Sequence, residues 1–207
     1  MSRRIGPGRA LALVAALAAA LVIGGVGRAR GIRSAKRPRA PHFRTLTRLA
    51  GLLPGYDTIG AAERKHGRGL AVTGGHPQGA RVWHSRQTGW YLYVDGFEYR
   101  GAGRDDTAVI DEMRVGVPDG TETDSPAISL SVKEASLFGT IHPGLRRSAV
   151  LARLTAKRIS PKSDRDSLSW RVRGFVRVND WTAFRVWEVV LHFDKREVLD
   201  EICIECE

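Results

Sequence analysis

The sequence predicts an α+β protein of two tandem modules, each a helical segment packed on a small antiparallel sheet, after an N-terminal apolar helix. The helix is indicated by an uncharged, mostly apolar run at residues 10–27. The modules are indicated by a recurrence. The Pro-Gly segment at residues 53–55 returns at 142–144. The segment VIDEMRV at 109–115 returns as VLDEICI at 198–204, again 89 residues later. Two landmarks at one offset favour an internal repeat.

The apolar run follows three arginines, Arg3, Arg4 and Arg9. Its length fits a long signal-peptide core or a short membrane-spanning helix. We therefore expect residues 1–27 to be a signal peptide or a membrane anchor, and the protein to be anchored in the cell membrane or exported to the periplasm or the outside. The sidedness stays open, because seven bases follow at residues 28–44 and the positive-inside rule would keep that side in the cytoplasm.

The formal net charge of +11 comes entirely from the N-terminal part of the chain. Residues 1–50 hold 11 Lys or Arg and no acid, which leaves 22 bases and 22 acids in residues 51–207. Since nucleic-acid binding needs a basic patch on the folded body, we expect no nucleic acid as a partner of the body. Residues 28–48 are a predicted basic linker, and residues 28–44 are a candidate site for anionic lipid.

The first module is predicted at residues 49–117. After the Pro-Gly segment we expect a helix that Asp57 caps and that Gly67 ends. Strands follow, among them the aromatic segment GWYLYVDGFEY, which leads into the recurring segment. Residues 118–136 form the predicted link between the modules, since their first part is rich in Pro, Gly, Thr and Asp.

The second module is predicted at residues 137–207. Its helix has Arg146 at the position of Asp57, so the N-cap is lost or shifted. Four apolar residues share one face of this helix: Ala149, Val150, Leu151 and Leu154. Four further apolar residues alternate as in a half-buried antiparallel strand: Trp187, Val189, Leu191 and Phe193. The polar DKRE at 194–197 predicts a tight turn.

The order of Pro-Gly, short helix and strands ending in LHFDKREVLDEI resembles the SmpA/OmlA (BamE-like) module, and its tandem arrangement resembles the BLIP-like β-lactamase inhibitor proteins. The segment IHPGLRRSAV at 141–150 matches the opening motif of the module through Ile141, Gly144, Leu145 and Val150, and departs from it at Arg146. The resemblance implies an extracytoplasmic binding or assembly module and no catalysis. A β-lactamase target is not implied, because the paired structural cysteines of the inhibitors are missing.

The two cysteines, Cys203 and Cys206, have the spacing of a redox or metal motif, yet they lie in a predicted strand. Residues three apart on a strand face opposite sides, and no second pair of ligands has zinc spacing. We expect structural thiols, with a disulfide or a metal site as alternatives, and we predict no cofactor and no catalytic residue.

The aromatic segment supplies the candidate partner-binding residues. They are Trp90, Tyr91, Tyr93, Phe97 and Tyr99. Alternation puts Trp90 on one face with Leu92 and Val94, and the two tyrosines at 91 and 93 on the other. If only the first face packs on the helix, the other exposes residues that are enriched in interface hot spots. In the alternative, both faces are covered.

The sequence thus predicts a non-catalytic cell-envelope binding or assembly module that engages a protein partner. One alternative is an enzyme with a site in a cleft between the modules. The other is a protein that binds anionic lipid or nucleic acid through the basic linker.

Overall fold

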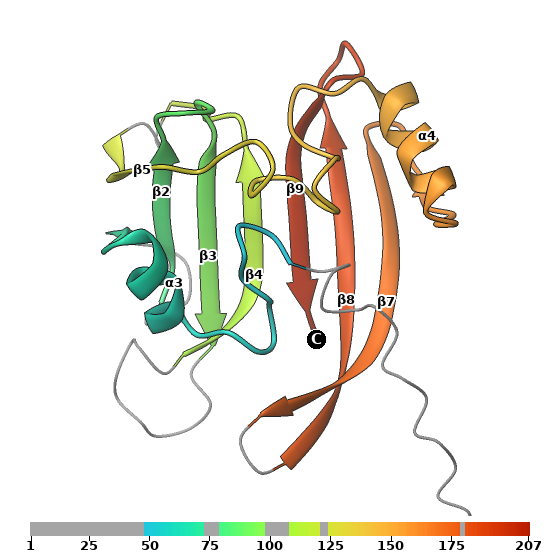
Figure 1. Cartoon of the computed structure of the whole chain (residues 1–207). Helices are drawn as coiled ribbons and strands as arrows, with labels where there is room; N and C mark the ends of the chain where they lie inside the picture. Colours follow the sequence, from blue (N-terminus) through green and yellow to red (C-terminus); the bar gives the residue numbers. More distant parts are fainter. Residues whose placement is uncertain (1–47, 73–78, 98–107, 121–123, 179–180) are drawn as a thin grey trace, which may run out of the picture. The chain divides into compact units, whose positions relative to one another are not determined.

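The computed structural model describes residues 48–207 except 73–78, 98–107, 121–123 and 179–180 (Figure 1). These residues belong to one compact unit, Ala40–Glu207. The predicted leader at 1–27 and the basic linker up to residue 47 lie outside the described residues, so the fold concerns the neutral body of the chain.

The described strands form one sheet of nine strands with the order β1-β2-β3-β4-β9-β8-β7-β6, and β5 pairs with β2. The pair of β2 and β5 is parallel and all the others are antiparallel. The strands are β1 (Leu70–Ala71), β2 (Arg81–Ser85), β3 (Tyr91–Phe97), β4 (Val109–Gly116), β5 (Ala127–Ile128), β6 (Lys162–Ser163), β7 (Ser167–Val178), β8 (Trp181–Phe193) and β9 (Leu199–Cys206).

The expected two-module α+β layout is wrong. β4 and β9, which end the two predicted modules, pair from Glu112 opposite Glu205 to Gly116 opposite Glu201, so strands of both halves build one continuous sheet. The described helices are only two and short, α3 (Ile59–His66) and α4 (Arg147–Ala156). The physical reason is that the last strand of each half offers an edge of unpaired backbone groups, and pairing β4 with β9 removes both edges.

The recurring sequence segments have a local explanation in this sheet. Gly55 N–H donates to Ile110 O, and Gly144 N–H donates to Leu199 O. Each Pro-Gly turn therefore docks on the strand that the second recurring segment begins. Both glycines have a positive φ, 74° and 89°, which favours Gly at these turns. The similarity of the recurring sequence segments therefore reflects two turns that dock on strands in the same way. It gives no support to a repeat of whole modules.

The helix ends differ in part from the expectation. Thr58, and not Asp57, is the N-cap of α3, and its hydroxyl accepts from Ala61 N–H at 3.1 Å. The Asp57 carboxylate instead accepts from Leu53 N–H at 2.7 Å and so fixes the preceding turn. Gly67 ends α3 with φ 82°. In α4, Arg146 makes no side-chain cap, and Leu151 is exposed while Val150 and Leu154 are buried.

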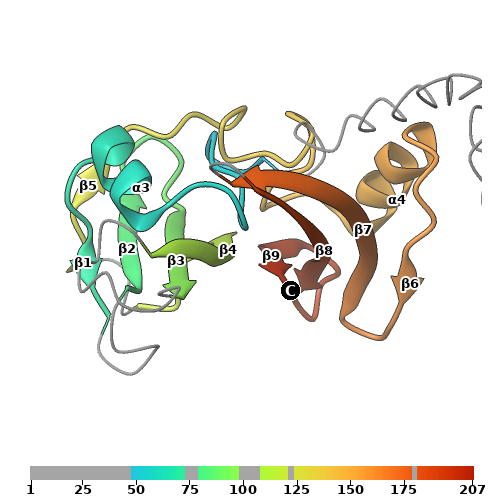
Figure 2. The ribbon, with the colours of Figure 1, turned by 90° about the horizontal axis from the view of Figure 1, so that it is seen from below.

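The two helices lie on the same side of the sheet, as the view in Figure 2 shows. Under them lies the core, which includes Trp83, Leu92, Met113, Trp187 and Ile204, all fully buried. The two indole N–H groups tie the cover to the sheet, because Trp83 donates to Gly67 O and Trp187 to Pro54 O, each at 2.9 Å. The predicted alternation along 187–193 is confirmed by the burial of its apolar positions.

The opposite side of the sheet is called here the open face, because no helix of the described chain lies over it (Figure 2). By register it consists of positions 91, 93 and 95 of β3, positions 112, 114 and 116 of β4, and positions 201, 203 and 205 of β9. It continues through the even positions 184–192 of β8 and the odd positions 169–175 of β7.

Among the described residues, no helix is long and apolar enough to cross a membrane, so the expected transmembrane helix has no counterpart here. The described part of the chain also contains no evidence of a signal segment. The apolar run at 10–27, on which both expectations depended, lies outside it.

Candidate functional site

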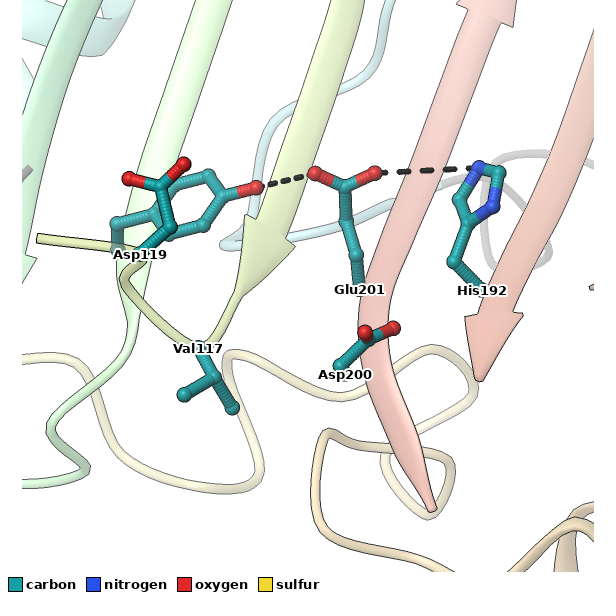
Figure 3. Close-up of a pocket in the computed structure, with 6 residues that line it drawn as sticks. Val117, Asp119, His192, Asp200 and Glu201 are labelled. Carbon is teal, nitrogen blue, oxygen red and sulfur yellow. Dashed lines mark hydrogen bonds and ion pairs between the residues drawn. The ribbon is translucent and has the colours of Figure 1, made fainter. Parts of the chain in front are cut away.

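A row of four residues crosses the open face and defines the candidate site. Tyr91, Gly116, Glu201 and His192 are direct neighbours on β3, β4, β9 and β8. The Tyr91 hydroxyl donates to Glu201 Oε2, and His192 Nε2 lies 3.9 Å from Glu201 Oε1 (Figure 3). The Glu201 carboxylate is thus approached from both sides by groups that can donate a hydrogen bond to it.

Gly116 makes the row possible. A Cβ at this position would lie 2.9 Å from Tyr91 Cε1 and 3.0 Å from the Tyr91 hydroxyl oxygen. The tyrosine ring therefore lies across β4 in the space that a side chain would fill. This close approach buries the ring to 8 % exposure and lets its hydroxyl reach the next strand but one.

Next to the row lies a polar pocket of about 210 Å³. Its lining consists of Tyr91, Val117, Asp119, His192, Asp200 and Glu201 (Figure 3). Three of these six residues are carboxylic acids. The pocket is open to water, because Asp119 is exposed and Val117 is 51 % exposed.

Asp200 is a partly buried acid in the lining of this pocket. Burial raises the pKa of its carboxyl above 3.8, and the nearby negative charge of Glu201 acts in the same direction. Its Oδ1 is buried and has no hydrogen-bond partner among the described residues. A cation in the pocket would stabilise the ionised form of Asp200 through its charge.

A second polar group lies further along the open face. The Tyr93 hydroxyl donates to Asp95 Oδ2 at 3.1 Å, and the Arg114 guanidinium lies over the Tyr93 ring at 5.4 Å. Burial and the Asp95 charge raise the pKa of Tyr93. Arg114 also donates to Glu112; burial lowers its pKa, but this bond and charge outweigh burial and leave the pKa raised. Tyr93 and Arg114 are thereby held in place at the surface.

One set of donors could hold a metal ion, namely Glu112, Cys203 and Glu205. Their ligand atoms lie within 4.8 Å of one another. However, burial and the charges of the two glutamates raise the pKa of the Cys203 thiol, and a metal binds the thiolate. Glu112 is also engaged by Arg114. A metal would have to displace both the thiol proton and the guanidinium, so we assign none.

The position of the two cysteines on β9 shows why their C-x-x-C spacing does not bring the thiols together. Cys203 lies on the open face opposite Arg114, whereas Cys206 lies opposite Trp187 on the covered side. A Cβ added at Gly55 would lie 2.4 Å from Cys206 Sγ, so this thiol fills the space above the glycine. The two thiols therefore face opposite sides of the sheet, as alternation predicts.

The hairpin of β7 and β8 extends the open face beyond the other strands. β8 pairs with β9 only as far as Trp187 opposite Cys206, and Figure 1 shows both strands continuing past the end of β9. On this extension, Phe175 and Phe184 are direct cross-strand partners in an edge contact with ring centroids 5.4 Å apart. They are 65 % and 52 % exposed, the two most exposed large apolar side chains that the structure describes.

Three of the five predicted aromatic residues have side chains that the structure describes, and they divide between the two faces as alternation predicts. Tyr91 and Tyr93 lie on the open face, Tyr91 buried in the row and Tyr93 half-buried. Trp90 packs against the core and stacks on His142, with centroids 5.7 Å apart. For Phe97 the structure describes only the backbone, and Tyr99 lies outside the described residues.

Sequence reasoning missed the other members of the site. His192, Asp200 and Glu201 lie more than 100 residues from Tyr91 in the chain, and only the pairing of β4 with β9 brings them near it. The exposed pair Phe175 and Phe184 had a detectable signal, since the two residues are equally far in sequence from Asn179-Asp180, a dipeptide typical of turns.

Comparisons of the chain with protein-family models, with curated proteins and with solved structures gave no match in any of the three. Nothing in them identifies the SmpA/OmlA or BLIP-like module that the motifs suggested. The function therefore has to be inferred from the site itself.

Proposed function

We propose that this protein is a binding module that docks a protein partner on the open face of its sheet. The observation that carries the proposal is the one-sided cover. Both described helices lie on the same side, while the opposite face presents polar and aromatic side chains across β3, β4, β9, β8 and β7.

The chemistry of this face supports a macromolecular partner. Tyr and Arg are enriched at the centres of protein interfaces, because they bury a large area and still make directed hydrogen bonds. Tyr93 and Arg114 are held by neighbours, so they lose little freedom on binding. The exposed phenylalanines at 175 and 184 add an apolar contact at one end of the same face.

The geometry favours binding over catalysis. The polar pocket contains a carboxylate between Tyr91 and His192, which is an arrangement for moving protons. However, it is open to water, and its lining has no Ser, Thr or Cys that could act as a nucleophile. Enzymes that use such groups exclude water from the reacting atoms, whereas this pocket is bordered by the exposed Val117 and Asp119.

Site-specific photo-crosslinking of the full chain tests the proposal. A benzophenone amino acid replaces Tyr93 or Arg171 on the open face, or Leu151 on α4 as the matched control on the covered side. We expect one protein adduct that forms from both open-face positions and is absent at the control position. The proposal is refuted if cell extracts and intact cells give no adduct at either open-face position, or the same adducts at all three.

A further inference from the structure

We propose that the partner is a protein segment that places a Lys or Arg side chain in the polar pocket and an apolar side chain on Phe175 and Phe184. This inference rests on the proposed function and adds the chemistry of the partner to it. Three observations on the open face carry it: its charge, the pocket, and the spacing of the two anchor points.

The centre of the open face is acidic although the chain as a whole is basic. On β3, β4 and β9 this face holds four carboxylates, Asp95, Glu112, Glu201 and Glu205, against the single guanidinium of Arg114. Asp119 and Asp200 add two more acids at the pocket. A cationic partner is therefore attracted to this region in spite of the net charge of +11.

This acidic centre is costly for the isolated fold. Glu112 and Glu205 are direct cross-strand partners on β4 and β9, and like charges at such positions repel each other. Arg114 relieves only Glu112, and Glu205 is exposed with a weak thiol contact at 3.7 Å. At the pocket, burial disfavours the ionised form of Asp200. A cation in the pocket relieves the cost at Asp200, whereas the repulsion of Glu112 and Glu205 remains, since neither of them lines the pocket.

The pocket has the size and composition for one cationic side chain. Its volume of about 210 Å³ is below the range of pockets for drug-sized ligands, which begins near ~300 Å³. Asp119, Asp200 and Glu201 contribute three carboxylates to its lining. The buried Tyr91 ring gives an apolar wall for the alkyl stem that Lys and Arg both carry.

The two anchor points are separated along β8 by a defined distance. His192 borders the pocket and Phe184 belongs to the exposed pair, and both lie on the open face. Their separation of eight positions on β8 corresponds to about 26 Å at the rise of a strand. An extended segment with a basic residue and an apolar residue about eight positions apart spans it. Between the anchors, the segment passes Glu188 and Arg171, which pair with each other at 2.7 Å, and then the exposed Arg173. The basic residue of the segment therefore belongs at the pocket and not at the phenylalanine end.

Fluorescence anisotropy with a defined probe tests this chemistry on the full chain. The probe is a fluorescein-labelled oligolysine peptide that ends in phenylalanine. Oligolysine without the phenylalanine, an oligoglutamate peptide, and free spermine as a competitor are the comparisons. We expect the first probe to bind most tightly and oligoglutamate not to bind. Spermine should compete only weakly, because it reaches only one of the two anchors.

Variants locate the binding on the face. Glu201→Gln and Asp119→Asn should each weaken the probe about tenfold, since each removes a charge at the pocket. Asp119 is exposed and lies outside the strands, and urea unfolding of the variant checks that its stability is unchanged. The matched control Asp164→Asn removes the same charge at an exposed position after β6 and should have less than a twofold effect. Phe175→Ser with Phe184→Ser should abolish the advantage of the phenylalanine-tailed probe alone.

The inference is overturned if no cationic peptide binds, or if spermine competes as strongly as the unlabelled peptide itself. It is also overturned if Asp164→Asn weakens binding of the probe as much as the pocket variants do. Any of these results leaves the crosslinking outcome at positions 93 and 171 unaffected. A partner that crosslinks there and yet ignores basic peptides would retain the proposed function with a different partner chemistry.

Discussion

Replacing Gly116 by alanine is the most direct test of the row that builds the site. The glycine has no positive φ, so the backbone itself accepts alanine. The new Cβ would however lie 2.9 Å from Tyr91 Cε1 and 3.0 Å from its hydroxyl oxygen and from Asp200 O. The carbonyl belongs to a paired strand and cannot retreat, whereas the tyrosine ring can rotate. We therefore expect the Tyr91 ring to leave Glu201 and to become exposed.

The magnitude follows from what the ring loses. A hydrogen bond to a charged group contributes about 1.5–3 kcal/mol to stability. Replacing glycine by alanine within a strand raises the free energy of unfolding by about 0.5–1 kcal/mol, because it lowers the entropy of the unfolded chain. Counting the hydrogen bond alone, the net loss for Gly116→Ala is about 1–2 kcal/mol, which lowers Tm by about 2–8 °C for a chain of this size. Exposure of the ring, which is 8 % exposed in the parent, adds to this loss, so these values are lower bounds.

The assay is urea unfolding of four proteins, namely the parent, Gly116→Ala, Tyr91→Phe and the double variant. If the alanine acts by removing the bond from Tyr91 to Glu201, its cost should shrink by about 1 kcal/mol or more once Phe already lacks the hydroxyl. An equal cost of Gly116→Ala in both backgrounds would falsify this reasoning, because the contact with Asp200 O alone would then explain the loss.

Three further predictions concern single groups. Burial raises the pKa of Asp200, so the folded state holds its proton more tightly than the unfolded state, and the stabilisation that this gives is lost as pH rises through the folded pKa. Asp200→Asn should therefore raise Tm at pH 7 and leave it unchanged below about pH 4; a gain that persists at acid pH would point to another cause. Burial also raises the pKa of the Cys206 thiol from 9.0 to about 11. Because the thiolate is the reactive form, iodoacetamide at pH 8 should alkylate Cys206 about 100-fold more slowly than a free cysteine. A rate close to that of the free amino acid would contradict the burial of this thiol. Thr58→Ala should cost about 1 kcal/mol in urea unfolding through loss of the N-cap of α3, whereas Thr155→Ala, an exposed control on α4, should cost much less.

The local structure was predictable where one segment decides it. Alternation of Trp187, Val189 and Leu191 fixed the covered face of β8, because a strand turns each second side chain to the same side. Gly67 as the end of α3 and the turn at residues 194–197 also follow from local chemistry, the latter through Asp194, whose carboxylate accepts from two following N–H groups at 2.8 Å. The N-cap was misplaced by one residue, since Asp57 and Thr58 are both good caps and only the turn contacts choose between them.

The candidate site shows the limit of such reasoning. Tyr91 was predicted as a surface residue of a binding face, because its neighbours Leu92 and Val94 are apolar and alternate with it. Its burial depends on Gly116, which leaves room for the ring, and on Glu201, which accepts a hydrogen bond from its hydroxyl. Neither dependence is visible in the segment that contains the tyrosine, since both partners belong to other strands.

By itself, the sequence determined the neutral body, the basic N-terminal part, the alternating strands and the opposite orientation of the two thiols. These properties depend on composition or on the two-residue period of a single strand. Only the tertiary structure decided that both halves share one sheet and that acids of β4 and β9 meet at its centre. The reason is that the pairing of two strand edges is a choice between distant segments. The pairing uses backbone N–H and C=O groups that every strand carries, so no local pattern of side chains predicts which two edges will pair.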